Sequence, residues 1–289
     1  MTISMRRVLP GVLGALAAAI GGPIPAEAQA ASDAVVKIEA LPGTIVRWSV
    51  PGTKRCGMGK RSWAALQETC YYPIDLLQKV AVLKVSRHGA GPAAHAQISV
   101  LASPYETEDI DLGEIPQANP SPADLRRNSR DQALVDKVWT RPEGPARFTL
   151  PLGPLASPMP EGKSFGAKWI FDGKPDSSED HSGADYTLAA GTPVAAVADG
   201  TVVIAEDLFF TGNAVFLDHG DALISMYFHL AELKVQAGQD VKKGEILGLV
   251  GSTGRVTGPH LHLGVRWHGA RINPELLLDD PAKIPAIGP

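Results

Sequence analysis

The chain has 289 residues, of which 44% are hydrophobic and 20% charged, and its net charge is −4. This length is compatible with two domains of ordinary globular composition, and the mild negative charge argues against a nucleic-acid-binding protein. The 30 glycines and 24 prolines, with few long amphipathic periods, predict a mainly β fold of short strands joined by turns.

Residues 1–30 have the layout of a secretory signal peptide. The segment "MRRVLPGVLGALAAAIGGPIPAEAQA" has two arginines, an apolar stretch from Val8 to about Ile20, and small residues at Ala28 and Ala30. A membrane anchor is the alternative interpretation, but the stretch falls short of the ~20 residues that span a bilayer. We therefore expect cleavage after Ala30 and export to the periplasm or cell envelope, without a stable membrane anchor.

Residues 31–108 are expected to form a small antiparallel β domain. The segments "TIVRWSV", "KVAVLKVS" and "AQISVLA" alternate or run apolar, and Pro and Gly bound them. His88 and His95 lie in "RHGAGPAAHA", which we interpret as a flexible loop with solvated histidines.

The two cysteines of the chain, Cys56 and Cys70, both lie in this N-terminal domain. In an exported protein a disulfide is the expected state, and free buried thiols are the alternative. A bond that closes a loop of about 15 residues would stabilise the fold by roughly 3 kcal/mol.

Residues 109–145 are interpreted as a linker that contains one helix. The linker is acidic and rich in proline, and the helix is expected to begin after Ser121 and to end near Trp139. Ser121 can cap the helix, Pro122 fits its first turn, and Asp124 complements the helix dipole.

Residues 146–289 predict a second domain, which is mostly antiparallel β with a cleft formed by loops. Its short β-branched segments are separated by Gly turns, as in "GTPVAAVADGTVVIAED", "NAVFLDHGDALISMYFHL" and "QDVKKGEILGLVGSTG".

Five residues of this second domain are candidates for chemistry: His181, Asp185, His229, His260 and His262. In a strand, His260 and His262 would project from the same side, and His181 and Asp185 could reach one point across a bend. Imidazole and carboxylate suit Zn2+, whose catalytic sites use three protein ligands and a water. Five candidates exceed three, so two histidines would remain for proton transfer and charge stabilisation.

The region from Ser164 to Leu278 resembles the lysostaphin-type zinc metallopeptidases, which are cell-wall endopeptidases with a duplicated hybrid motif fold. The matching segments include "SFGAKW", "HSGAD", "GNAVFLDHG", "YFHL" and "VKKGEILGLVGSTGRVTGPHLHLGV". The chain departs from the family at Ala167, Lys168 and Trp169, where members often have an arginine-rich segment.

The resemblance implies a role for each candidate residue. His181, Asp185 and His262 would be the zinc ligands, and His229 and His260 the catalytic histidines. The implied function is an exported zinc metallo-endopeptidase that hydrolyses peptide cross-links of peptidoglycan, with the stem peptides as its partner. The family pattern makes His219 a structural hairpin residue, and His268 is interpreted likewise.

Two alternatives remain open at this point. One is a non-hydrolytic envelope module that binds peptidoglycan or activates an amidase, although such relatives typically lack metal ligands. The other is a secreted protease that acts on proteins. Lys168, Arg255 and Arg266 could contact substrate carboxylates, but ordinary surface charge is the simpler interpretation of each.

Overall fold

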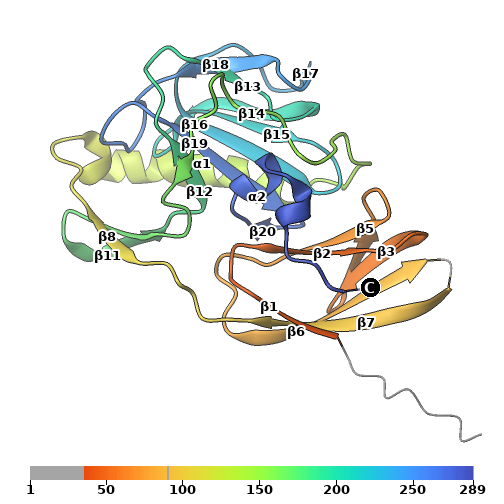
Figure 1. Cartoon of the computed structure of the whole chain (residues 1–289). Helices are drawn as coiled ribbons and strands as arrows, with labels where there is room; N and C mark the ends of the chain where they lie inside the picture. The colour runs from red at the N-terminus through yellow and green to blue at the C-terminus, as the bar shows by residue number, and fades with distance from the viewer. Residues whose placement is uncertain (1–35, 90, 289) are drawn as a thin grey trace, which may run out of the picture. The chain divides into compact units, whose positions relative to one another are not determined.

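The computed structural model describes residues 36–89 and 91–288 (Figure 1). The described residues belong to one compact unit, and the expected signal peptide lies outside them. No helix within this described part is both long and apolar enough to cross a membrane.

The N-terminal part is built from two small sheets. The five-stranded sheet has the order β1-β7-β6-β3-β4, with bounds Val36–Ala40, Gly91–Val100, Ala81–Gly89, Thr53–Met58 and Arg61–Ala64. The second sheet pairs β2 (Ile45–Ser49) with β5 (Thr69–Pro73). The expected antiparallel arrangement holds for all of these pairs except β1 and β7, which run parallel.

The predicted loop around His88 and His95 is wrong. β6 and β7 continue as a paired hairpin almost to its tip, with Ser86 opposite His95 and Arg87 opposite Ala94. Both histidines are exposed, as expected. The described residues of the hairpin tip beyond Arg87 and Ala94 are exposed, so this part of the sequence lacks the apolar alternation that predicts a strand.

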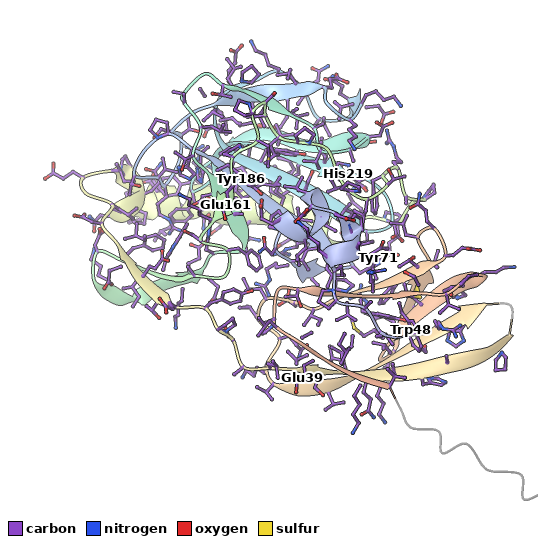
Figure 2. All side chains as sticks on the ribbon, viewed as in Figure 1. Glu39, Trp48, Tyr71, Glu161, Tyr186 and His219 are labelled. Carbon is purple, nitrogen blue, oxygen red and sulfur yellow. A yellow bond between two sulfur atoms is a disulfide. The ribbon has the colours of Figure 1, made fainter. Side chains whose placement is uncertain are left out.

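A disulfide bond joins Cys56 of β3 to Cys70 of β5, which confirms the expected pairing. Both residues are fully buried, and they lie in the apolar cluster that fills the space between the two N-terminal sheets. Trp48, Trp63 and Tyr72 are the large aromatic members of this cluster, and Trp48 is labelled in Figure 2. The bond therefore connects the two sheets through their shared core.

The C-terminal part is dominated by a ten-stranded sheet in which all the pairs are antiparallel, as expected. Its main path is β17-β14-β15-β16-β19-β12-β9, with bounds Asp240–Val241, Gly200–Leu208, Gly212–Asp218, Leu223–Leu233, Leu261–Trp267, Gly183–Tyr186 and Gly162–Lys163. Beside this path lie β13 (Pro193–Ala195), β18 (Ile246–Val250) and β20 (Ala270–Arg271).

A three-stranded sheet joins the linker to the C-terminal part. β8 (Thr107–Ile110) pairs in parallel with β10 (Lys168–Phe171), and β10 pairs with β11 (Lys174–Asp180). The sequence did not predict β8, because "TEDI" is polar and largely exposed and so shows no apolar alternation. The first linker residues are thus part of a sheet.

The expected linker helix is confirmed as α1 (Pro122–Val138). Ser121 and Asp124 form a capping box, and Trp139 is the C-cap residue. Leu134, Val135 and Val138 pack against β14, β15 and β16, so α1 covers one face of the large sheet (Figure 1). The other helical elements are the short α2 (Glu275–Leu278), η1 (Pro116–Ala118) and η2 (Pro281–Lys283).

The N-terminal and C-terminal parts make direct contacts. Asp75 accepts two hydrogen bonds from the Arg271 guanidinium, at 2.7 and 3.0 Å. The rings of Tyr71 and Trp267 lie 5.3 Å apart, and Tyr71 is labelled in Figure 2. The chain end also returns to β2, where Arg47 forms backbone hydrogen bonds with Pro285 and Ile287.

Candidate metal centre

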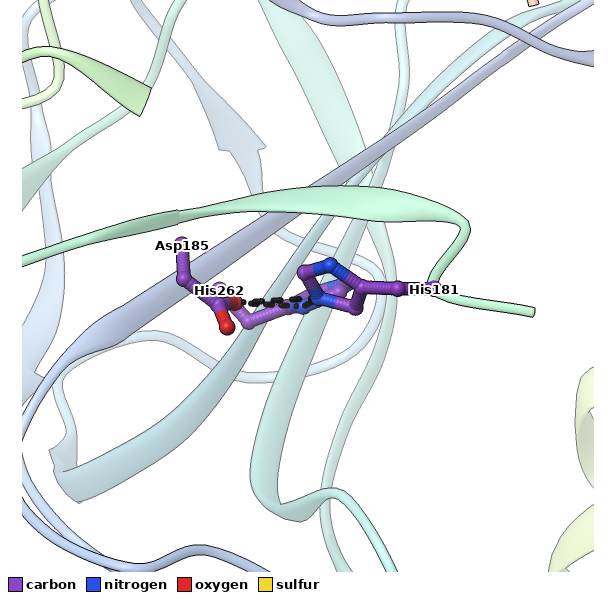
Figure 3. A group of neighbouring side chains, drawn as sticks. All are labelled: His181, Asp185 and His262. Atoms are coloured by element: carbon purple, nitrogen blue, oxygen red, sulfur yellow. Dashed lines mark hydrogen bonds and ion pairs between the residues drawn. The ribbon is translucent and has the colours of Figure 1, made fainter. Parts of the chain in front are cut away.

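Three side chains from neighbouring strands meet at one point of the large sheet. His181 lies in the turn between β11 and β12, Asp185 lies in β12, and His262 lies in β19. The antiparallel register of β12 and β19 places Asp185 directly opposite His262. Figure 3 shows the three side chains pointing toward one another. The structure thus brings His262 next to His181 and Asp185, which lie far from it in the sequence.

The distances among the ligand atoms fit a metal ion. His181 Nε2 lies 3.1 Å from Asp185 Oδ1 and 2.9 Å from His262 Nδ1, and His262 Nδ1 lies 3.0 Å from Asp185 Oδ1. Ligands bound tetrahedrally to Zn2+ at its usual bond lengths would lie about 3.3 Å apart. Two imidazole nitrogens and a carboxylate oxygen are also the donor set expected for this metal.

The His181 ring is fixed by the turn before β10. Its Nδ1 lies 2.7 Å from the Ser164 carbonyl oxygen, and because a carbonyl can only accept, Nδ1 donates and Nε2 keeps its lone pair. The His181 backbone also donates to Ala167 and accepts from Gly166. The indole of Trp169 stacks on the imidazole, with centroids 3.9 Å apart.

The His262 ring is held between Phe228 and Gly183. It stacks on Phe228 at a centroid distance of 5.0 Å and an angle of 6°. A Cβ atom at Gly183 would lie 2.4 Å from His262 Nε2, so only glycine leaves room for this ring. Burial lowers the pKa of His262, which favours the neutral imidazole that binds metal.

Asp185 is a half-buried carboxylate that stays ionised. Burial alone would raise its pKa, but the hydrogen bonds with His181 and His262 outweigh burial and hold the pKa well below its usual range. The site therefore presents a negative charge beside two imidazoles, an arrangement that favours a divalent cation.

The two remaining candidate histidines lie beside this group. The ring of His229, in β16, is 5.0 Å from the His260 ring and 6.1 Å from the His262 ring. His260 Nε2 lies 3.8 Å from Asp185 Oδ1. The structure therefore brings all five predicted residues into one cluster.

Both of these histidines are oriented by backbone carbonyls. His229 Nδ1 donates to the Thr253 carbonyl oxygen at 2.9 Å, and His260 Nδ1 donates to that of Gly258 at 2.9 Å. Each ring thus keeps its Nε2 available for chemistry. His229 also has a φ of +64°, an unusual value for a residue with a side chain, and it lies where the pairing of β16 changes register.

A cavity of about 360 Å³ opens beside the metal centre. Asp185, His229 and His260 line it together with aromatic and basic side chains, Trp169, Phe171 and Arg255 among them. The Arg255 guanidinium lies over Phe171 and forms an ion pair with Glu179. Glu108, Ile110 and Leu112, in and just after β8, form another wall, which sequence analysis did not assign to the site.

The two histidines interpreted as structural lie in other environments. His219 is fully buried, and its ring contacts Ser225 Oγ at 2.7 Å and the Asp199 carbonyl oxygen at 2.8 Å. His268 lies at the turn between β19 and β20, with its ring 4.5 Å from that of Trp63. Neither belongs to the group of converging ligand atoms.

The family model of Peptidase family M23 matches residues 179–274, a segment that includes all five candidate residues. This segment is a Peptidase family M23 domain. The match confirms the resemblance to lysostaphin-type metallopeptidases.

The chain is similar in part to two named proteins. Peptidoglycan DD-endopeptidase ShyA of Vibrio cholerae is 42% identical over 93 residues, which are 32% of this chain and 22% of ShyA. The chain thus matches about a fifth of the length of this relative. The catalytic domain of lysostaphin from Staphylococcus simulans is 28% identical, over 50% of this chain and 97% of that one, with a TM-score of 0.34.

A crystal structure assigned to peptidase M23 from Pseudomonas aeruginosa is similar over most of the chain. It covers 82% of this chain and 94% of its own, with 28% identity and a TM-score of 0.61. Because the M23 domain occupies only residues 179–274, this likeness includes much of the fold that precedes it.

Proposed function

We propose that this chain is an exported zinc metallo-endopeptidase that hydrolyses the peptide cross-links of peptidoglycan. The observation that carries the proposal is the convergence of His181 Nε2, Asp185 Oδ1 and His262 Nδ1 to separations of 2.9–3.1 Å. Support for the substrate class comes from ShyA, which is named a peptidoglycan DD-endopeptidase.

In this proposal, His181, Asp185 and His262 would hold Zn2+. As a Lewis acid, the ion would polarise the scissile carbonyl and make water a nucleophile near neutral pH. Ser164 contacts the His181 ring and Phe228 contacts the His262 ring. These contacts preorganise the donor atoms for metal binding.

His229 and His260 are proposed to move the protons of the reaction. The water oxygen bonds to the carbonyl carbon, the C–N bond breaks, and the proton that leaves the water ends on the leaving amine. The Nε2 atoms of both rings can take part, because their Nδ1 atoms already donate to Thr253 and Gly258. One histidine accepts the proton, and the other stabilises the oxyanion or protonates the amine.

We also propose an organisation for the rest of the chain. Residues 1–30 direct export to the periplasm or cell envelope, residues 31–108 form an N-terminal β domain, and residues 109–145 link it to a catalytic domain at residues 146–289. The partner is then the stem peptide of peptidoglycan, lying in the cavity beside the metal centre.

The decisive experiment uses protein that begins at Ala31, purified cross-linked peptidoglycan, and mass spectrometry of the soluble products. Cross-linked dimers should be converted to monomers, a chelator should stop the reaction, and Zn2+ should restore it. Substitution His262→Ala should abolish zinc binding, whereas His229→Ala should keep the metal and lose about 10²–10⁴-fold in turnover. Intact cross-links after incubation with zinc-loaded protein would reject the proposal.

The same assay separates the two alternatives. A secreted protease for proteins would digest unfolded protein substrates and leave peptidoglycan intact. A non-hydrolytic module would bind peptidoglycan without releasing fragments, and His229→Ala would not alter that binding.

A further inference from the structure

A second cavity, of about 320 Å³, lies where the end of α1 meets β16 and the hairpin of β19 and β20. The N-terminal sheet contributes Arg61 to its lining. Basic side chains gather here, since Arg141, Arg266 and His268 also line it. None of the candidate metal ligands or catalytic histidines belongs to this lining.

Arg266 is the central charge of this cavity. Its guanidinium lies 4.1 Å above the Trp139 ring, and its Nε is buried without a hydrogen-bond partner. Within the described residues it makes no ion pair, whereas its cross-strand neighbour Arg271 is paired with Asp75. Burial and the nearby charge of Arg271 lower the pKa of Arg266, and they outweigh the opposing charges of Asp75 and Asp136.

His268 adds an unpartnered polar atom. The residue is 1% exposed, and its ring lies between those of Trp63 and Trp267, at 4.5 and 5.9 Å. Its Nε2 is buried without a hydrogen-bond partner, although Asp221 Oδ2 lies 3.7 Å away. Buried polar groups are rarely left unpaired, and a hydrogen bond to water or to a ligand would satisfy this one.

The remaining lining decides the chemistry of a ligand. Two carboxylates reach it, Asp218 and Glu143, and Asp218 is already engaged by Arg141 at 3.3 Å. Three arginines therefore face two carboxylates, which leaves a positive excess. The rest of the wall is largely apolar and consists of Val138, Trp139, Pro142, Ala222 and Ile224.

We propose that this cavity binds the carboxylate of a small ligand whose remaining part is aliphatic, such as the C-terminus of a short peptide. A planar guanidinium suits a carboxylate, because two parallel hydrogen bonds can form. The apolar wall favours such a ligand over an inorganic anion, and the volume, at the low end for ligand sites, fits one or two small residues.

This site is separate from the metal centre. His262 and Arg266 lie on the same face of β19, four residues or about 13 Å apart. Met226 and Phe228 of β16 lie beside this stretch of β19, and they belong to the apolar cluster that packs against α1. Ligand binding here therefore does not depend on the proposed hydrolytic function.

The test is calorimetric titration of the full chain, zinc-loaded and chelator-treated, with N-acetyl-dialanine, its C-terminal amide, and inorganic phosphate. The acid should bind with a Kd in the millimolar range or below, equally in both preparations, and at least tenfold more tightly than the amide or phosphate. Equal binding of acid and amide, or no binding, would overturn the proposal. Phosphate that binds as tightly as the acid would also overturn it.

Substitutions of single arginines test whether the ligand binds in this cavity. Substitution Arg266→Met should abolish binding of the acid, and Arg61→Ala, at an exposed position, should weaken it severalfold without affecting folding. Arg130→Met removes the same charge from an exposed position on α1 outside the cavity, and its binding should match that of the unaltered chain. If Arg266→Met fails to fold, unchanged binding in Arg61→Ala is sufficient to reject the site.

Discussion

The indole ring of Trp169 lies on the imidazole ring of His181, with centroids 3.9 Å apart and an angle of 22° between the planes. Because this contact restrains the ring of a proposed zinc ligand, Trp169→Leu should weaken zinc affinity by about 10–100-fold. Trp169→Phe keeps a stacking ring and should lose much less. Competition with a chromophoric chelator measures the affinity, and Lys168→Ala, at the exposed neighbouring position, is the control. Unchanged affinity in Trp169→Leu would show that the stack does not support the site.

The position of the Trp169 ring depends in turn on a contact with β8. Trp169 Nε1 donates to Glu108 Oε2 at 3.2 Å, across the parallel pair of β8 and β10. We expect Glu108→Ala to weaken zinc binding by severalfold, and Glu108→Gln to restore it because the amide oxygen still accepts the bond. Glu106→Ala, at the exposed position just before β8, is the matched control, since the backbone carbonyl of Glu106 accepts the hydrogen bond from Lys168 of β10 and the substitution leaves it in place. Equal affinities in Glu108→Ala and Glu106→Ala would contradict this prediction.

The five residues of the candidate site could be predicted from the sequence, whereas the residues that hold their side chains in position could not. His181, Asp185 and His262 belong to short motifs whose order and spacing are recognisable by resemblance. Glu108 and Trp169, by contrast, meet through a parallel pairing between strands 61 residues apart, and a short, polar edge strand leaves no periodic signal. Such contacts depend on the tertiary arrangement.

The fold, too, has features that could be predicted from the sequence and features that could not. The capping residues of α1 are local, and so its start and end could be predicted from Ser121 and Trp139. The extension of β6 and β7 beyond the core could not, because their exposed ends bury neither face. The return of the chain end to β2 likewise depends on tertiary contacts. Arg47 forms backbone hydrogen bonds with Pro285 and Ile287, and its guanidinium donates to the Ile284 carbonyl oxygen.

Gly183 provides a direct test of the ring position of His262. A methyl group at this position would lie 2.4 Å from His262 Nε2, so Gly183→Ala should displace the ring and weaken zinc binding by at least tenfold. Gly144→Ala is the matched control, since a Cβ there meets no atom within 4 Å. Zinc titration of both proteins, with circular dichroism to confirm folding, gives the answer. A Gly183→Ala protein with native affinity would mean that the ring can move without losing the metal.

The disulfide between Cys56 and Cys70 should contribute to the stability of the N-terminal sheets. With a sequence separation of 14 between the two cysteines, the chain-entropy model gives about 3 kcal/mol. The double substitution to alanine should therefore lower the free energy of unfolding by about this amount, measured by urea denaturation. Zinc affinity should stay unchanged, because neither residue contacts the metal centre. A loss of zinc affinity together with stability would show that the two parts of the chain are coupled.

The ion pair of Asp75 with Arg271 should make stability depend on pH in the acid range. Burial alone would raise the pKa of Asp75, but the hydrogen bonds from Arg271 and the backbone lower it below its usual value near 3.8. The folded state thus favours the ionised form, and the stabilisation is fully present above pH 3.8 and is lost as pH falls through the lower, folded pKa.

Substitution Asp75→Asn should therefore cost about 2 kcal/mol of unfolding free energy at neutral pH, as for a hydrogen bond to a charged group. The difference in unfolding free energy between this variant and the unaltered chain should shrink below pH 4, where Asp75 begins to be protonated in the unfolded chain. Urea denaturation at a series of pH values measures it, with Asp109→Asn, an exposed carboxylate on β8, as the control. A difference that stays constant down to pH 2 would mean that neutral hydrogen bonds, and not the charge of Asp75, hold the two parts together.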